Sequence, residues 1–437
     1  MHESVSMNLV ANPEFSGAGE VADGWSYVSP RPDLVLGHGK ERNAAGDAVL
    51  VLEATDDRLA FGCWRGTLTI ETQKWYEASV TVRLADIEDP TLSVFVQAAR
   101  HFLVPEGPWQ EETVLRQLVR SDRDHEFQGN HFEVYLRAAT RGRIEISDPS
   151  FIEIPDPDFR TARVATVRFD HEINNLTVAQ QRDRLAEQLD LAGGVEPDIV
   201  ITTEFTPVIG VPESEYKSFW DVAEPVPDGP VCRIASAAAK KHNMHVIVGN
   251  IERRGAHMFN TAVLFGRDGR FLGQYDKTHL TIGELEWGVS CGDKYPLFDL
   301  DFGRIGIHIC YDEWFPEVAR YYAHQGAEIL FLCVAGGKPI TWRTRALDNG
   351  VHFVASSTLP PSIIIESSGD IVAENHRGGF AWADLNLDYR QTNAYRDPML
   401  AYGMPCIAPQ MRNVLDHQLL DDLSGSIRDI NRPPGPK

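Results

Sequence analysis

The pattern of apolar and polar positions changes once along the chain. Before about residue 155, short alternating or apolar runs recur between loops rich in Gly, Pro and Asp, and no helical period emerges. This spacing is typical of an antiparallel β-sandwich, in which each strand turns one face to the core and one to solvent. The predicted strands cover residues 48–52, 78–84, 92–96, 132–136 and 144–154.

From residue 163 onward, apolar β-branched runs alternate with segments of helical period, which predicts alternating strands and helices. Thr177 and Gln180 have the spacing of a capping box and mark the start of one helix. Asp268 and Gly269 form the turn of a predicted hairpin. The predicted strands cover residues 164–169, 198–202, 244–248, 259–265, 271–275, 305–310 and 329–334, and further helices cover residues 231–242 and 316–325.

The two patterns meet at Pro155 and Pro157, and two prolines this close disfavour both helix and strand. A chain of 437 residues is also too long for one ordinary core. We therefore predict a β-sandwich over residues 1–155, a mixed α+β domain over residues 160–394 and a C-terminal extension over residues 395–437. The extension is expected to provide a dimer contact and to end in a disordered tail.

The net charge of the chain argues against two classes of binding partner. The chain has 41 Lys and Arg against 63 Asp and Glu, so its formal net charge is −22. A surface this acidic repels nucleic acids and anionic membranes, and neither is expected as a partner. The sequence shows no apolar run of membrane-spanning length and no secretory signal pattern at its first residues.

The six cysteines, at positions 63, 232, 291, 310, 333 and 406, show neither CxxC spacing nor a disulfide framework. This usage fits a reducing cytoplasm, which would keep a reactive thiol reduced. No spacing typical of a metal site and no nucleotide-binding motif is present. We therefore expect a cytoplasmic protein that needs no metal and no cofactor.

One cysteine is distinguished by its surroundings. Residues 304–317 read RIGIHICYDEWFPE, an apolar run that ends at Cys310 and is followed by a helix-compatible stretch. A helix N-terminus stabilises a thiolate, so this position predicts a nucleophilic cysteine, and a structural core cysteine is the alternative. By strand alternation His308 lies on the same face, where it would form either a Cys–His dyad or a hydrogen-bonded core pair.

Two charged residues at predicted strand ends complete the candidate chemistry. Glu204 follows the strand at 198–202, where a buried carboxylate can act as general base and acid; an exposed loop acid is the alternative. Lys277 follows the hairpin within the segment YDKTHL, and an ammonium there would stabilise a thiolate and a tetrahedral intermediate. A solvated surface lysine is its alternative.

With these segments, the order Glu204, Lys277, Cys310 resembles the nitrilase superfamily of carbon–nitrogen hydrolases over residues 160–390. The resemblance implies a four-layer α-β-β-α domain, a small-molecule substrate and a homodimer or higher homo-oligomer. It implies a cysteine hydrolase that cleaves a non-peptide carbon–nitrogen bond of a small amide or carbamoyl compound through a thioester. Nitrile hydrolysis and acyl transfer to an amine are alternatives within the same chemistry.

The superfamily also carries a second glutamate after the lysine. Glu284 and Glu286 both fit that place: the interval to Gly288 favours Glu284, and the interval to the turn at Cys291 and Gly292 favours Glu286. We prefer Glu284. The resemblance further implies that Tyr311, Trp314 and Trp342 lie on the substrate side of the site.

The first region carries a second resemblance. The opening NLVANPEF followed by GW, and the later segment ISDPSF, are similar to the first and last strands of jelly-roll modules related to carbohydrate-binding domains. This implies a jelly-roll-like sandwich that contacts a glycan. A structural lid or dimer contact is the favoured alternative, and a catalytically dead carbohydrate-binding protein is a distant one.

Overall fold

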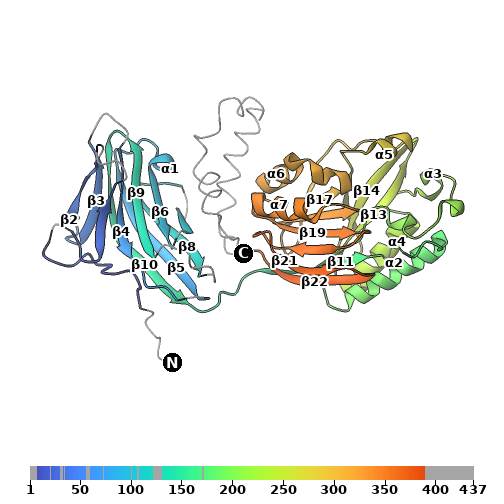
Figure 1. The fold of residues 1–437 in the computed structure, drawn as a ribbon, viewed down its shortest axis with the longest axis horizontal. Helices are drawn as coiled ribbons and strands as arrows, with labels where there is room; N and C mark the ends of the chain where they lie inside the picture. The colour runs from blue at the N-terminus through green and yellow to red at the C-terminus, as the bar shows by residue number, and fades with distance from the viewer. Residues whose placement is uncertain are drawn as a thin grey trace. The chain divides into compact units, whose positions relative to one another are not determined.

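The computed structural model describes residues 7–388, except residues 20, 30–32, 34, 56–59, 72, 100, 106–107, 122–129 and 170–171. The chain divides into two compact units with the boundary between Asp158 and Phe159, and Figure 1 draws them in blue to teal and in green to red. The predicted extension, residues 395–437, lies outside the described residues. No helix in the described part of the chain is both long and apolar enough to cross a bilayer.

The described part of the first unit consists of antiparallel strands and one helical turn. They are β1 Trp25–Val28, β2 Gly37–Arg42, β3 Ala48–Ala54, β4 Ala60–Thr67, β5 Trp75–Ala85, α1 Pro90–Ser93, β6 Val94–Ala98, β7 His101–Pro105, β8 Glu112–Arg120, β9 His131–Ala139 and β10 Gly142–Ile154. The strand order is β1-β4-β9-β6-β7-β8-β5-β10-β3-β2. β7 pairs with both β6 and β8 and so joins the two halves of this order.

The sheet of the first unit folds back on itself around one core. β3 and β4 are well separated in the strand order, yet they pack against each other, and Leu52 and Trp64 from these strands share a single hydrophobic cluster. Each of the five predicted strands overlaps one of β3, β5, β6, β9 and β10. The strand start predicted at residue 92 was wrong, because Pro90–Ser93 forms a helical turn before β6 begins. The resemblance to carbohydrate-binding modules stays a prediction.

The second unit contains two six-stranded sheets. The first has the order β15-β14-β13-β12-β11-β22 and the second β16-β17-β18-β19-β20-β21. The strands are β11 Thr161–Arg168, β12 Ile199–Ile201, β13 His245–Arg254, β14 His257–Phe265, β15 Phe271–Asp276, β16 Leu297–Asp299, β17 Arg304–Ile309, β18 Ile329–Val334, β19 His352–Ser357, β20 Ser362–Ile365, β21 Ile371–Asn375 and β22 Gly379–Asn386. The helices are α2 Val178–Gly193, η2 Thr206–Val208, η3 Glu213–Glu215, α3 Phe219–Val222, α4 Pro230–His242, α5 Ile282–Glu286, η4 Cys310–Trp314, α6 Pro316–His324 and α7 Pro339–Asn349.

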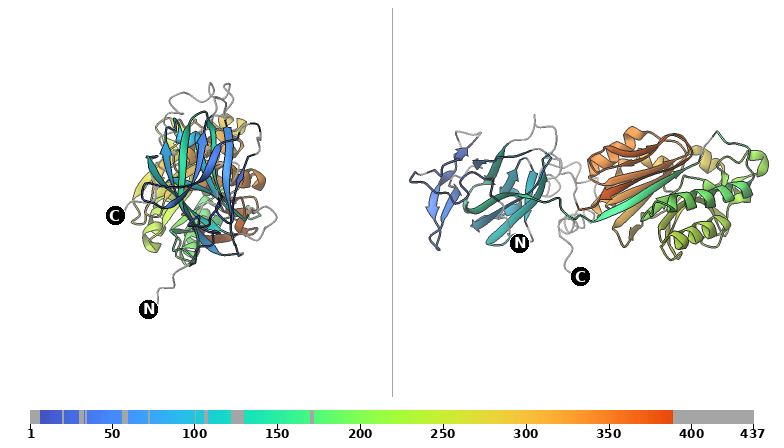
Figure 2. Two further views of the ribbon diagram at one scale, coloured as in Figure 1. Left: turned by 90° about the vertical axis from the view of Figure 1, so that its left-hand side faces the viewer. Right: turned by 90° about the horizontal axis from the view of Figure 1, so that it is seen from below.

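Three apolar clusters separate four layers in the second unit. One cluster lies between the two sheets and includes Ile201 and Phe331. A second packs α2 and α4 on the first sheet, and a third packs α6 and α7 on the second sheet. Figures 1 and 2 show the green helices outside the first sheet and the orange helices outside the second. The predicted α-β-β-α arrangement is confirmed, as is the capping box of Thr177 and Gln180 at the start of α2.

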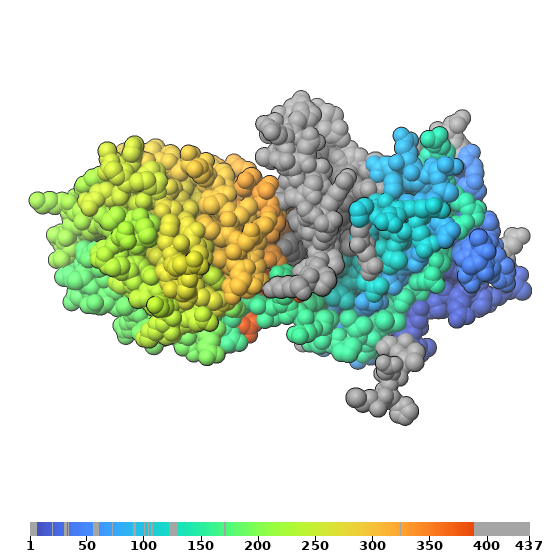
Figure 3. Space-filling model, turned by 180° about the vertical axis from the view of Figure 1, so that it is seen from behind, coloured from blue at the N-terminus to red at the C-terminus, as the bar shows by residue number. Residues whose placement is uncertain are grey.

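The segments of the first and second sheets lie side by side in the second unit. Figure 3 shows this where the yellow-green and orange segments border each other. β12 runs parallel to β11 and β13, and β17 runs parallel to β18. Residues of the site follow the carboxyl ends of strands from both sheets: Glu204 lies three residues after β12, Lys277 follows β15, Cys310 follows β17 and Ala335 follows β18. The fold therefore gathers strand ends from both sheets, where α/β proteins usually place their sites.

Candidate active site

A buried cluster of one cation and two carboxylates forms the centre of the site. Lys277 Nζ lies 2.9 Å from Glu204 Oε1 and 2.8 Å from Glu284 Oε2. All three side chains are at most 2% exposed. Because an ion moved out of water loses several kcal/mol of solvation, such a cluster persists only when its members are paired and hydrogen-bonded.

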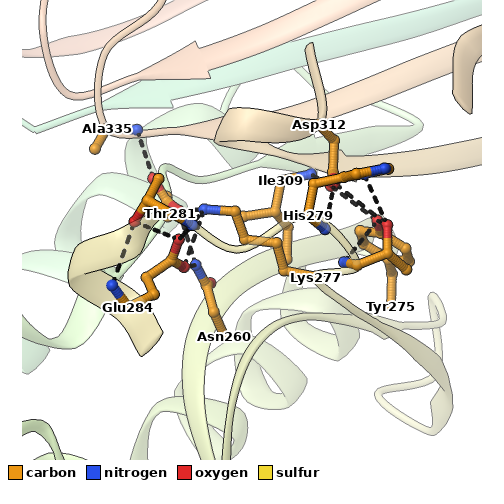
Figure 4. A network of polar contacts seen from close by, with 11 residues as sticks. Asn260, Tyr275, Lys277, His279, Thr281, Glu284, Ile309, Asp312 and Ala335 are labelled. Atoms are coloured by element: carbon orange, nitrogen blue, oxygen red, sulfur yellow. Dashed lines mark hydrogen bonds and ion pairs between the residues drawn. The ribbon is translucent and has the colours of Figure 1, made fainter. Parts of the chain in front are cut away.

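Asn260 and Thr281 supply further hydrogen bonds to this cluster. Asn260 on β14 donates from Nδ2 to Glu204 Oε1 at 2.8 Å and to Glu284 Oε1 at 2.7 Å. Thr281 donates from its backbone N–H and from its hydroxyl to Glu284 Oε2. Figure 4 shows Lys277 and Asn260 converging on the carboxylate of Glu284. Sequence reasoning missed both residues.

A signal for Thr281 was available in the sequence. Thr281 and Glu284 have the spacing of a capping box, and the structure has this box at the start of α5. The box turns Glu284 back toward the helix N-terminus, where Lys277 lies, while Glu286, the last residue of α5, is exposed. The structure therefore brings Glu284, and not Glu286, to the lysine.

The charges around Lys277 keep it protonated. Burial alone would lower the pKa of its ammonium, but Glu204, Cys310 and Glu284 outweigh burial, and the pKa is raised. Lys277 is therefore a permanent cation at neutral pH. A fixed cation at this place can stabilise negative charge that develops on a bound molecule.

Cys310 lies at the turn after β17 and has a positive φ of 45°. The expectation that a helix N-terminus would lower its pKa was wrong. α6 begins only at Pro316, and the pKa of the Cys310 thiol is raised well above its ordinary value by burial and by the charge of Glu204. Lys277 and the backbone N–H of Ala335 act in the opposite direction. A thiol in this setting needs a base before it can attack.

That base lies in contact with the sulfur. The Glu204 carboxylate lies close enough to the Cys310 thiol to raise the pKa of that thiol, and its Oε2 accepts the N–H of Ala335 at 3.0 Å. Acid, cation and thiol thus lie together, although they come from three separate strand ends. The arrangement can move a proton off the sulfur and stabilise the anion that follows.

A second network surrounds Asp312 and connects the lysine segment to the nucleophile turn. Asp312 Oδ2 accepts the hydroxyl of Tyr275 at 2.8 Å and the N–H of Ile309 at 2.9 Å. Its Oδ1 lies 2.9 Å from Nδ1 of His279. Figure 4 shows this group beside the Lys277 cluster. Residues on both sides of Lys277 are therefore held against the turn that carries Cys310.

The residues predicted on the substrate side lie in different environments. Tyr311 is 38% exposed and Trp314 is 50% exposed, so both can meet a molecule from solvent. Trp342 is only 1% exposed, and its indole N–H donates to Glu313. The structure thus places Trp342 in the core between α7 and the second sheet, where it contacts a protein carboxylate instead of solvent.

His308 does not form a dyad with Cys310. Its ring packs against Tyr322 and Phe353, at centroid distances of 5.3 and 5.8 Å, on the helix side of the second sheet. Strand alternation stops at Ile309, because the left-handed backbone of Cys310 redirects the chain toward Glu204. In the described part of the chain, no three His, Cys, Asp or Glu side chains are grouped so that they could hold a metal ion.

Comparisons with known proteins identify relatives of the second unit. A family model described as carbon-nitrogen hydrolase matches residues 163–395. A citrullinase of Francisella tularensis is 28% identical over 275 residues, which cover 54% of this chain and 94% of that protein. An omega-amidase of Bos taurus is 36% identical over 174 residues, covering 34% of this chain and 62% of that protein.

Other matches cover smaller shares or are more distant. A probable hydrolase of Bacillus subtilis is 40% identical over 131 residues, and the chain spans only 25% of that protein's length. A crystal structure of a Saccharomyces cerevisiae member of branch 10 of the nitrilase superfamily aligns with a TM-score of 0.48 at 22% identity. That alignment covers 59% of this chain and 99% of the yeast chain.

Proposed function

The chain belongs to the carbon-nitrogen hydrolase family, and on that premise we propose that it hydrolyses a small amide or carbamoyl compound through a thioester on Cys310. The observation that carries the proposal is the buried contact of Glu204 with both the Cys310 thiol and the Lys277 ammonium. A base, a fixed cation and a nucleophile are the groups that acyl transfer from nitrogen to water requires.

The first half of the reaction transfers the acyl group to sulfur. Glu204 takes the proton of the Cys310 thiol, and the sulfur attacks the substrate carbonyl carbon. Lys277 stabilises the negative charge that moves onto the carbonyl oxygen. The carbon–nitrogen bond then breaks as Glu204 returns the proton to the leaving nitrogen, which departs as ammonia or an amine.

The second half releases the acid. Glu204, again a carboxylate, takes a proton from water, and the resulting hydroxide attacks the thioester carbon. The carbon–sulfur bond breaks, and the proton on Glu204 returns to the sulfur. The raised pKa of Cys310 supports this cycle, because a thiol that is protonated at rest requires a neighbouring base before its sulfur can attack.

The remaining contacts assign supporting roles. Glu284 and Asn260 hold Lys277 and Glu204 in place, since each bonds to at least one of them. Tyr311 and Trp314, both exposed beside the nucleophile, are proposed to contact the substrate. Glu286 is left without a role in this scheme because it is exposed.

A panel assay tests the proposal. Purified protein is incubated with small amides, ureides and nitriles, with and without an added amine acceptor, and ammonia and product are measured. We expect ammonia from an amide or ureide, none from Cys310→Ala and on the order of 10²-fold less from Glu204→Gln, while Glu286→Gln matches the wild type. Unchanged turnover by Cys310→Ala would contradict the mechanism, and release from nitriles alone would replace the proposed substrate class.

A further inference from the structure

Glu313 is a buried acid three residues after the proposed nucleophile. Its side chain is 2% exposed, and it lies on the same turn, η4, as Cys310. Glu313 Oε1 accepts the backbone N–H of Lys338 at 3.2 Å, and Oε2 accepts the indole N–H of Trp342. The mechanism above does not use this carboxyl group, although burying it is costly.

The two donors to Glu313 lie near each other in the chain: Lys338 directly precedes α7, and Trp342 lies at the beginning of α7. We call residues 335–338 the strap; it connects β18 to α7 and begins with Ala335. Ala335 donates its N–H to Glu204 Oε2 at 3.0 Å and also interacts with the Cys310 sulfur. The far end of the strap, Lys338, is the residue bonded to Glu313.

The strap contains two glycines, and one of them explains how Glu313 reaches it. A Cβ atom on Gly337 would overlap Glu313 Oε2 and would lie 2.7 Å from Cζ2 of Trp342. Only a residue without a side chain lets the backbone pass this close to the carboxyl and the indole. Strap, carboxyl and indole are therefore packed as one unit directly beside the reacting groups.

We propose that Glu313 is a positioning residue, which fixes the strap so that the Ala335 N–H lies against Glu204 and Cys310. The inference rests on the proposed function, because the groups it positions are the proposed base and nucleophile. It also gives Trp342 a role: the indole is the second donor that holds the Glu313 carboxyl in place.

The two N–H donors distinguish a glutamate from a glutamine at position 313. A carboxylate accepts on both oxygens, so it can bind the Lys338 N–H and the Trp342 N–H together. A glutamine of the same shape accepts on one atom only and turns its own N–H₂ toward the other donor. Glu313→Gln therefore removes one of these two hydrogen bonds with almost no change in side-chain volume.

Glu313→Gln, Trp342→Phe and the double variant are compared with Glu286→Gln, which makes the same substitution at an exposed site of the same unit. All are made in a Cys291→Ser, Cys406→Ser background, because Cys291 is exposed and would compete as a thiol. Turnover, thermal midpoint and the pH dependence of Cys310 alkylation by iodoacetamide are measured for each.

We expect Glu313→Gln to lower kcat about tenfold or more while KM stays within about threefold. Loss of the Ala335 N–H removes a donor that favours the thiolate, so the pH at half-maximal alkylation of Cys310 should rise. The double variant should be no worse than Glu313→Gln, because without the indole N–H the glutamine can accept from Lys338 without facing a second donor.

A wild-type kcat and alkylation profile in Glu313→Gln would overturn the proposal. So would a lowered thermal midpoint with an unchanged alkylation profile, or losses that multiply in the double variant. These outcomes are distinct from failure of the proposed function, which Cys310→Ala and Glu204→Gln report. The alkylation profile needs no substrate, and it reads the position of the strap even if the panel finds no turnover.

Discussion

The two units bury different kinds of side chain. In the first unit, Glu133 is the buried charged residue among those described, and half-exposed Arg65 pairs with it at 2.7 Å. The second unit buries charged side chains at many positions: Arg168, Glu204, Glu224, Glu252, Lys277, Glu284, Asp312 and Glu313. Both units otherwise have ordinary apolar cores.

The difference lies in where these charges are placed. Half of the charged residues buried in the second unit, Glu204, Lys277, Asp312 and Glu313, follow strand ends around Cys310, and Glu284 bonds to Lys277; Glu133 lies within a strand, β9. A buried charge costs several kcal/mol unless it is paired, so a fold that needs only stability replaces it with apolar residues. Concentration of such groups in one place therefore indicates a site, and a single pair in a sheet indicates ordinary structure.

We expect Lys277→Met to have the largest effect on stability and turnover. Removing the cation leaves Glu204 and Glu284 buried together without their partner, so we expect unfolding to become easier by about 3–5 kcal/mol. Turnover should fall on the order of 10³-fold, because the developing charge loses its stabiliser. Denaturant unfolding and kcat measure the two effects. Lys277→Arg should not restore activity, since a planar guanidinium does not fit a place built for an ammonium.

Glu204→Gln should act on catalysis more than on folding. The amide keeps the shape of the side chain but cannot carry a proton, so we expect kcat to fall on the order of 10²-fold. Glu286→Gln, the same change on an exposed acid, is the matched control and should match the wild type. Steady-state kinetics on the substrate found by the panel decides the result, and equal rates for the two variants would remove Glu204 from the mechanism.

His308 makes the stability of the second unit depend on pH. Burial lowers its pKa from 6.5 to about 4. The unfolded chain therefore binds a proton that the folded chain does not, and stability is lost as pH falls from about 6.5 toward 4. The full shift corresponds to roughly 3 kcal/mol. Denaturant midpoints measured across this range should fall less steeply for His308→Leu than for the wild type; parallel slopes would contradict the assignment.

We expect Arg65→Met, in the first unit, to have the smallest effect on stability. Like Lys277→Met, the change replaces a cation with an apolar side chain, but Arg65 is half-exposed, and Gln97 also donates to Glu133. We expect a loss of about 1 kcal/mol in stability, which thermal or denaturant unfolding can detect. A loss of stability as large as that of Lys277→Met would contradict this, because it would show that Glu133 depends on Arg65 as strongly as Glu204 and Glu284 depend on Lys277.

Features set by neighbouring residues could be predicted from the sequence. Strand and helix positions follow from local periodicity, and the ends of β12, β15 and β17 were placed well enough to identify Glu204, Lys277 and Cys310 as candidates. The four layers followed from the family resemblance. The strand start predicted at residue 92 was too early, because a proline begins a helical turn before β6.

Features set by residues distant in the sequence were decided only by the tertiary structure. Asn260 joins the charged cluster because β14 brings it beside Glu204, and Ala335 reaches Glu204 across 131 positions of chain. The pKa of Cys310 is raised because the whole fold buries it, which outweighs any local effect of the following helix. Trp342 faces Glu313 for the same reason, since burial and pairing depend on how the layers pack. Sequence alone therefore determined which groups could react, and packing determined their protonation and their partners.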